Sequence, residues 1–272
     1  MDDHRLPGEL RRLFADGGGG RSLSIGLPEG EVIWPDPGYT GQGEPLRPAF
    51  WMSDEPATGD DWRRFLAEHP RSGLWPVLLD ESAQPWAVGQ VVPDDPVQID
   101  HFTAEGFMTE VWEEWVAQMP PDALAELEPY GAICPGLAPP GRPVAEPDAV
   151  AAWFAGELAA RGMPLGLVAA QRSADALAVM GWQGALHHNE WMVPLAAVVR
   201  SWEDRFGARV VGVGFNTLEI SVAAPPADLE HALHVAAEHW TFCPDNVLQG
   251  AGDLHGYAGQ LIGSHAWSFW WD

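Results

Sequence analysis

The chain closes on a dense run of aromatic residues, and this run constrains the fold more than any other feature. Four of its last six residues are Trp or Phe. In a β-strand, successive side chains point to opposite faces, so the run would present two alternating sets. The sets are Trp267, Phe269 and Trp271 on one face, and Ser268, Trp270 and Asp272 on the other. Because so much aromatic surface has to be buried, we expect a core strand here and not a flexible tail.

Composition favours a folded protein with ample core material. Of 272 residues, 46% are hydrophobic and fifteen are Trp, which argues against global disorder. No apolar run approaches the roughly 18 residues of a membrane span. The first residues lack a basic segment followed by an apolar one, so we expect no signal peptide. Cys134 and Cys243 are then expected to be free thiols, and the predicted location is the cytoplasm.

The charge is strongly negative and unevenly spread. The formal net charge is −25, and residues 72–141 hold twelve acids and no Lys or Arg. Such a surface repels phosphate backbones and anionic lipids, which argues against nucleic-acid and membrane binding. Two interpretations of the acidic segment stay open. It is a solvated, solubilising surface, or it docks a basic protein partner through complementary charge, with residues 105–128 as the part to test.

A proline-rich segment divides the chain into two predicted domains. Residues 138–147 hold four Pro in ten positions, which is typical of an extended linker. We therefore predict an acidic N-terminal α+β domain over residues 1–137 and a second α+β domain over residues 148–272. Both halves mix helix and strand patterns, so the predicted fold class is α+β, with two α/β-type halves.

Four segments of the N-terminal half have a clear pattern. They are a hairpin at 22–34, a helix at 60–69, a strand at 74–79 and a helix at 109–119. Pro76 lacks a backbone N–H, which favours the edge of a sheet for the strand that contains it. In the last helix we expect Trp115 on an apolar stripe, and Glu110 and Glu114 on the opposite face.

The C-terminal half has a clearer pattern. Helices are predicted at 149–161, 174–180, 195–206, 228–240 and 254–261, and strands at 165–170, 210–215, 218–222 and 267–271. Apolar stripes and closing glycines support the helices, and alternating apolar residues support the strands. The main elements follow the order strand, helix, strand, strand, helix, strand. This is the order of a ferredoxin-like, or split βαβ, sandwich, in which the extra short helices would be insertions.

Several phrases of the C-terminal third resemble one protein family. The most specific are Phe242-Cys243-Pro244-Asp245 with Gln249-Gly250, and the closing Trp270-Trp271-Asp272. Others are Gly181-Trp182-Gln183-Gly184-Ala185 and Ser201-Trp202-Glu203-Asp204-Arg205-Phe206-Gly207-Ala208. On these phrases, residues 163–272 resemble the domain of unknown function 4253, a family common in bacteria. Asn216 departs from the pattern, which has Asp after the Phe. The resemblance implies no reaction, cofactor or substrate.

Cys243 is the first candidate for chemistry, because a thiol near a helix end can become a reactive thiolate. His239 lies one helical turn upstream and could act as its base. Asp245 works against this, because a nearby anion raises the pKa of a thiol. A buried structural cysteine is the competing interpretation.

A set of His and acidic side chains is the second candidate. Asp228, His231, His234 and Glu238 share one face of the predicted 228–240 helix, at a spacing that can hold zinc. His187 and His188 could add ligands from a preceding loop. The competing interpretation is a solvated helix face, and we expect no metal and no other cofactor.

A polar aromatic groove at the closing strand is the third candidate. We expect eight residues to form one functional corner there. They are Trp202, Glu203, Cys243, Asp245, Gln249, Gly250, Trp270 and Asp272.

Two functions follow from these candidates. We favour a non-enzymatic binding module, of an immunity or regulatory type, for a basic protein partner. The alternative is a metal- or thiol-dependent enzyme. Its centre would lie at Cys243 and Asp245 and at the face formed by His231, His234 and Glu238.

Overall fold

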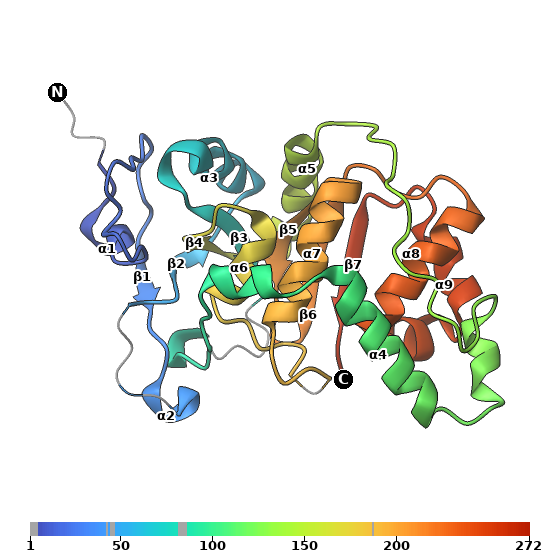
Figure 1. Ribbon diagram of the computed structural model, residues 1–272. Coiled ribbons are helices and arrows are strands. Elements are labelled where there is room, and N and C mark those ends of the chain that lie inside the picture. Colours follow the sequence, from blue (N-terminus) through green and yellow to red (C-terminus); the bar gives the residue numbers. More distant parts are fainter. Residues whose placement is uncertain (1–4, 42, 44–46, 81–85, 187) are drawn as a thin grey trace.

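One mixed β-sheet of seven strands organises the molecule (Figure 1). The structure, a computed structural model, describes residues 5–41, 43, 47–80, 86–186 and 188–272. The strands are β1 (Gly30–Ile33), β2 (Phe50–Pro56), β3 (Trp75–Leu79), β4 (Pro164–Val168), β5 (Ala208–Val213), β6 (Thr217–Val222) and β7 (Ala266–Trp270). Their order is β1-β2-β4-β3-β5-β6-β7. Only β3 and β5 are parallel neighbours among these strands; the other pairs are antiparallel.

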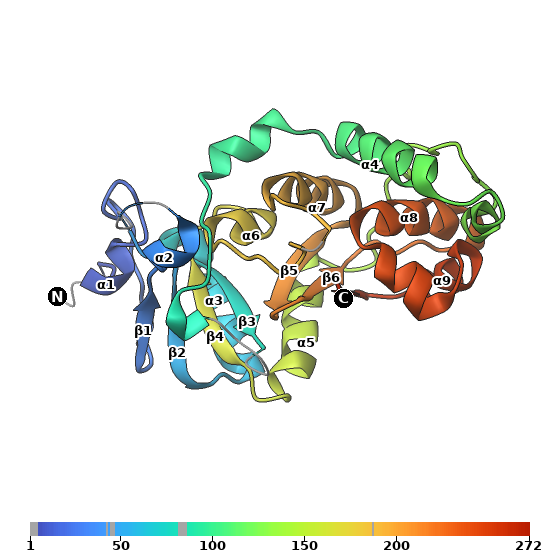
Figure 2. The ribbon, with the colours of Figure 1, turned by 90° about the horizontal axis from the view of Figure 1, so that it is seen from below.

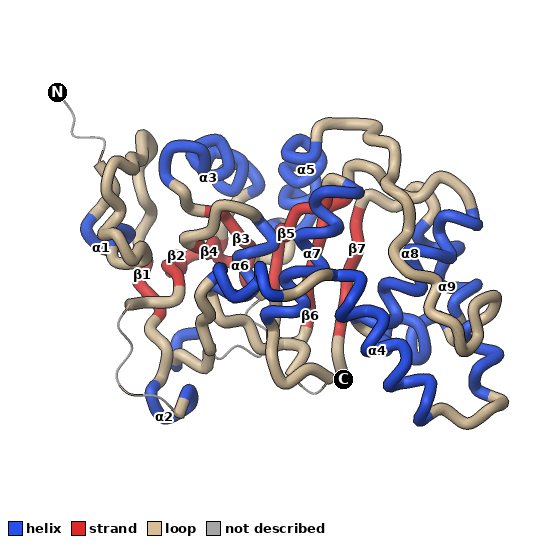
Figure 3. The backbone as a smooth tube through the Cα atoms, viewed as in Figure 1, coloured by secondary structure: helices blue, strands red, loops and turns tan. Residues whose placement is uncertain are grey.

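Helices cover both faces of this sheet and extend beyond its β7 end. On one face, α3 (Gly59–Ser72) packs against α5 (Pro147–Ala159), and α7 (Val193–Phe206) lies on the other face (Figure 2). The helix α4 (Ala104–Gln118) lies on the outside, over α7 and α8 (Leu229–Phe242), and α9 (Leu254–Leu261) packs on α8. The short helices are α1 (Gly8–Arg11), α2 (Pro37–Thr40) and α6 (Ala176–Val179) (Figure 3).

Local signals set the ends of the main helices. Thr58 and Asp61 form a capping box at the start of α3, which satisfies two backbone donors that the helix leaves free. The Asp228 side chain accepts a hydrogen bond of 2.9 Å from the His231 backbone N–H and so begins α8. Gly207 ends α7 with a left-handed backbone, φ 60°, a conformation that favours glycine.

The predicted alternation along the closing strand is confirmed. In β7 and the residue that follows, Trp267, Phe269 and Trp271 are buried, whereas Ser268 is exposed and Trp270 is half-buried. The buried set packs against α7 and α8. There the ring of Trp202 stacks on that of Phe269, with the centroids 5.5 Å apart. The aromatic run therefore belongs to the core, as we expected.

The α+β class is confirmed, but the strand order of the C-terminal half differs from the predicted ferredoxin-like order. In a ferredoxin-like sandwich, the four strands of that half would pair with one another. Instead, β4 pairs with β2 and β3, and β3 separates it from β5. Strand order depends on pairing between distant segments, which local sequence patterns do not encode.

The two predicted domains share this one sheet. The proline-rich segment between them runs along the C-terminal half and forms backbone hydrogen bonds with it. Gly141 N–H donates to the Arg205 carbonyl at 3.0 Å, and Val144 N–H donates to the Ala223 carbonyl at 3.1 Å. The boundary at 138–147 stays a prediction, and the strands of both halves interleave across it.

Two expectations for the N-terminal half are wrong. The strand β1 pairs with β2, with Glu31 opposite Met52, and does not belong to a hairpin at 22–34. Pro76 lies in the central strand β3 and not at an edge. The sheet tolerates it because parallel pairing with β5 begins only at Leu78.

Among the described residues, no helix combines the length and the apolar character that a membrane crossing needs.

Candidate functional site

The structure places Cys243 and Asn246 along the free edge of β7. The Cys243 thiol donates to the Trp270 carbonyl at 2.9 Å. The Asn246 side-chain amide donates to the Ser268 carbonyl at 2.7 Å and accepts from Trp270 N–H at 3.1 Å. These side chains bond to backbone groups that a further strand would otherwise satisfy. The turn after α8 is therefore an edge cap for the sheet.

Asp245 joins three segments at the same corner. One carboxylate oxygen accepts from His188 Nε2 and from the Asp272 backbone N–H, both at 3.0 Å. The other accepts from the Gln249 side-chain amide at 2.7 Å. Gln249 and the neighbouring Gly250 lie in the π-helix Asn246–Ala251, and both are exposed. Six of the eight predicted corner residues thus do come together, around Asp245 and the end of β7.

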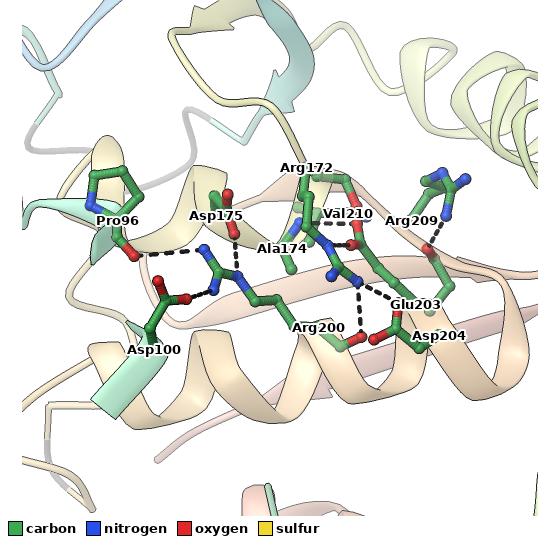
Figure 4. A network of polar contacts seen from close by, with 12 residues as sticks. Pro96, Asp100, Arg172, Ala174, Asp175, Arg200, Glu203, Asp204, Arg209 and Val210 are labelled. Carbon is green, nitrogen blue, oxygen red and sulfur yellow. Dashed lines mark hydrogen bonds and ion pairs between the residues drawn. The ribbon is translucent and has the colours of Figure 1, made fainter. Parts of the chain in front are cut away.

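Trp202 and Glu203 lie elsewhere, so the predicted convergence of all eight residues is wrong. Trp202 is fully buried in the core, where its indole N–H donates to Glu238 at 2.7 Å. The Glu203 carboxylate accepts instead from Arg172 Nε at 2.6 Å (Figure 4). Consecutive residues of a helix point about 100° apart, which explains why these two side chains diverge.

The environment of Cys243 does not favour a reactive thiol. Burial raises the pKa of the thiol to about 12, and the nearby Asp245 carboxylate adds to the increase. His239 is fully buried, and its Nδ1 is 3.0 Å from the Tyr257 hydroxyl. Burial lowers the pKa of His239 well below 6.5, and the positive charge of Arg205 lowers it further. At neutral pH the thiol is therefore protonated and without solvent access.

The helix face proposed for metal binding is divided among three separate contacts. His231 Nε2 lies 2.8 Å from the Pro139 carbonyl, and His234 stacks on Tyr130. Glu238 is buried and accepts two hydrogen bonds of 2.7 Å from Arg205. Within the described residues, which exclude His187, no group of three or more His, Cys, Asp and Glu is placed to hold a metal ion.

A cleft of about 560 Å³ lies at the end of β4. Its central cation, Arg200, contacts Asp175 at 2.5 Å and Asp100 at 2.6 Å (Figure 4). Arg21, which also lines the cleft, pairs with Asp16 at 2.8 Å. The arginines of this cleft are thus neutralised within the chain, and we assign it no ligand.

A smaller hollow of about 280 Å³ lies beside α4, and the sequence did not predict it. Three aromatic and three acidic residues line it. They are Phe102, Phe107 and Trp115, and Glu110, Glu114 and Glu190. We call this site the α4 hollow. The only available signal was the spacing on α4, where residues 107, 110, 111, 114 and 115 lie on one side of the helix.

Comparison with known proteins assigns a family to part of the chain. Residues 164–272 match the family model described as Domain of unknown function (DUF4253). The match confirms the resemblance found in the sequence. No curated protein and no solved structure matches the chain.

The two sites relate differently to the DUF4253 segment. The edge cap and the contacts of Asp245 lie entirely within it. The α4 hollow lies between it and the N-terminal half. His188 and Glu190 come from the DUF4253 segment, whereas α4 and Phe102 lie outside it. The hollow is therefore a feature of this chain's two halves together.

Proposed function

We propose that the protein is a non-enzymatic binding module for a basic protein partner. One observation carries the proposal, namely an acidic surface that the chain itself leaves unneutralised. Seven carboxylates on α4 and on the segment after it form this surface, which we call the acidic face. They are Glu105, Glu110, Glu113, Glu114, Asp122, Glu126 and Glu128.

The arginines of the chain do not neutralise the acidic face. None of its seven carboxylates forms an ion pair with a described residue. In contrast, nine of the fourteen arginines pair with an acid among the described residues. They are Arg21, Arg63, Arg64, Arg71, Arg161, Arg172, Arg200, Arg205 and Arg209. Uncompensated negative charge on one face speeds encounter with a positively charged surface.

The position of the acidic face suits docking. The helix α4 lies on the outside of the molecule, where it packs on α7 and α8 (Figures 1 and 2). Met108 and Trp112 point inward from it and are buried, which fixes the helix on rigid elements. The carboxylates are thus presented in a defined arrangement, and a partner does not have to order the helix when it binds.

The biological setting that we propose is a bacterial cytoplasm, and the role is of an immunity or regulatory type. The alternative, a thiol- or metal-dependent enzyme, gains no support from the burial of Cys243 or from the separate contacts of His231, His234 and Glu238.

Charge reversal on the acidic face tests the proposal. The variant Glu105→Lys/Glu113→Lys/Asp122→Lys changes three exposed residues. The control Glu31→Lys/Asp54→Lys/Glu55→Lys makes the same change at the β1 end of the sheet, on exposed residues again.

Each protein is used to capture partners from a lysate of the native host at about 0.05 M and about 0.5 M salt, which differ severalfold in screening length. We expect the wild type and the control to retain one basic protein in equal molar amount at low salt. The acidic-face variant and the high-salt wash should lose it. Equal recovery by both variants would show that the acidic face only keeps the protein soluble.

A further inference from the structure

The α4 hollow has the composition of a site for a planar cation. Its aromatic walls are Phe102, Phe107 and Trp115, and its carboxylates are Glu110, Glu114 and Glu190. An aromatic face attracts a cation within about 6 Å of the ring, and carboxylates form short, charge-assisted hydrogen bonds with guanidinium groups. Few other ligand groups use both kinds of wall at once.

The carboxylates of the α4 hollow are available to a ligand. Glu110, Glu114 and Glu190 side chains form no hydrogen bond or ion pair with another described residue. The basic side chain in the lining is His188, and its Nε2 is already bonded to Asp245 at 3.0 Å. The hollow is therefore negative and open to a cation from outside the chain.

Packing holds the walls of the α4 hollow in place before any ligand binds. The Trp115 ring stacks on His188, with the centroids 5.9 Å apart and the planes at 28°. The Phe102 ring meets Trp191 edge-on at 5.2 Å, and the Trp191 indole donates to Asp94 at 3.0 Å. A preorganised wall lowers the entropy that binding costs.

The size of the α4 hollow suits a single side chain. It measures about 280 Å³ and is open to solvent, which places it at the lower end of the roughly 300–1,000 Å³ of ligand pockets. An arginine side chain offers an apolar stem and a planar head that stacks on rings and bonds carboxylates through two N–H groups. A lysine head is a compact point charge and uses the rings less well.

We propose that the α4 hollow is a socket for one arginine side chain of the basic partner. This inference rests on the proposed function and adds to it the residue type that the partner inserts. Arginine and aromatic residues are enriched among the few interface residues that dominate binding energy. The surrounding acidic face would then steer the partner, and the socket would hold it.

The test uses the full chain and three short peptides that differ in one residue. The central residue is arginine, lysine or citrulline, which has the shape of arginine without its charge. Binding is followed by NMR through the indole N–H resonance of Trp115, assigned with Trp115→Phe. We expect a saturable shift with the arginine peptide, a weaker one with lysine and none with citrulline.

Matched variants separate the socket from general charge. Glu110→Gln/Glu114→Gln removes two carboxylates from the hollow, and Glu105→Gln/Glu113→Gln removes two from the same helix outside it. We expect the first variant to weaken the arginine peptide about 10-fold or more and the second to change its affinity less than about 3-fold. Thermal unfolding confirms that both variants are folded.

The outcomes distinguish the socket from the proposed function. Equal loss in both variants, or equal binding of the citrulline peptide, would overturn the socket. If the partner is still captured through the acidic face in that case, the proposed function stands without it. If capture of the partner does not depend on the acidic face, the proposed function is refuted, whichever peptides bind.

Discussion

Replacing Glu238 by Gln tests the packing that joins the proline-rich segment to the C-terminal half. The Glu238 side chain is 1% exposed and accepts four hydrogen bonds. Two of 2.7 Å come from Arg205, one of 2.7 Å comes from the Trp202 indole, and one of 2.6 Å comes from the Ala138 N–H. Gln keeps the shape of the side chain but turns one acceptor oxygen into a donor group and removes the charge.

The expected cost follows from these contacts. At least two buried donors lose their acceptor, and Arg205 keeps a charge that is only 13% exposed without its partner. Removing one member of a buried ion pair costs about 3–5 kcal/mol. For a domain of this size, that cost lowers the melting temperature by roughly 6–20 °C.

Denaturant unfolding of Glu238→Gln and of a control measures this cost. Glu230→Gln is the control because it is exposed on the same helix, and we expect it to change the free energy of unfolding by less than about 0.5 kcal/mol. Glu238→Met combined with Arg205→Met should recover part of the loss, because neither charge is left unpaired. If Glu238→Gln is no less stable than Glu230→Gln, the account of this buried pair is refuted.

Four further predictions concern the side chains of Cys134, Cys243, His239 and Asn246. A thiol reagent at about pH 8 should modify the half-buried Cys134 in the folded protein and leave Cys243 unmodified until unfolding, since burial raises the pKa of Cys243 from 9.0 to about 12. The contribution of the protonated Cys243 thiol to the free energy of unfolding is complete below about pH 9 and is lost as the pH rises toward 12. The free energy of unfolding of a Cys243→Ala variant should therefore fall less steeply at alkaline pH than that of the wild type. An unchanged slope would contradict this assignment. Burial and Arg205 lower the pKa of His239 below 6.5. The contribution of neutral His239 to the free energy of unfolding is therefore present above about pH 6.5 and is lost in acid. In urea unfolding, the stability of His239→Asn should depend less on pH in that range than the stability of the wild type. Asn246→Ala removes three hydrogen bonds, two with the backbone of β7 and one with the Tyr257 hydroxyl. It should lower the free energy of unfolding by about 2–3 kcal/mol in calorimetry, whereas an unchanged stability would contradict the role of Asn246 as an edge cap.

Local sequence signals predicted most elements but not their arrangement. The apolar stripe and closing glycine of α7, and the alternation in β7, depend on near neighbours and were interpreted correctly. The insertion of β4 between β2 and β3 depends on pairing between residues that are 87 to 116 positions apart in the sequence. The prediction for Pro76 was wrong because the cost of its missing N–H depends on whether a neighbouring strand offers an acceptor at that position. This is a tertiary property, and β5 pairs with β3 only from Leu78 onward.

In the candidate site too, the local neighbourhood was predictable and the tertiary contacts were not. Cys243, Asp245 and Asn246 lie close together in the sequence, and their neighbourhood was predictable. Their bonds to β7 were not, since these required the sheet to end there. The α4 hollow was missed because Glu110 and Glu114 were placed opposite Trp115, whereas all three line the same wall. A helix can turn acidic and aromatic residues toward one hollow when a second segment, here residues 188–194, closes its other side.

The association rate constant of the captured partner, measured over a range of salt concentrations, tests the central claim most directly. If the acidic face docks a basic protein, the rate constant of the wild type falls steeply with salt, and Glu105→Lys/Glu113→Lys/Asp122→Lys lowers it while the dissociation rate changes little. A rate constant that is indifferent both to salt and to this charge reversal would contradict the account.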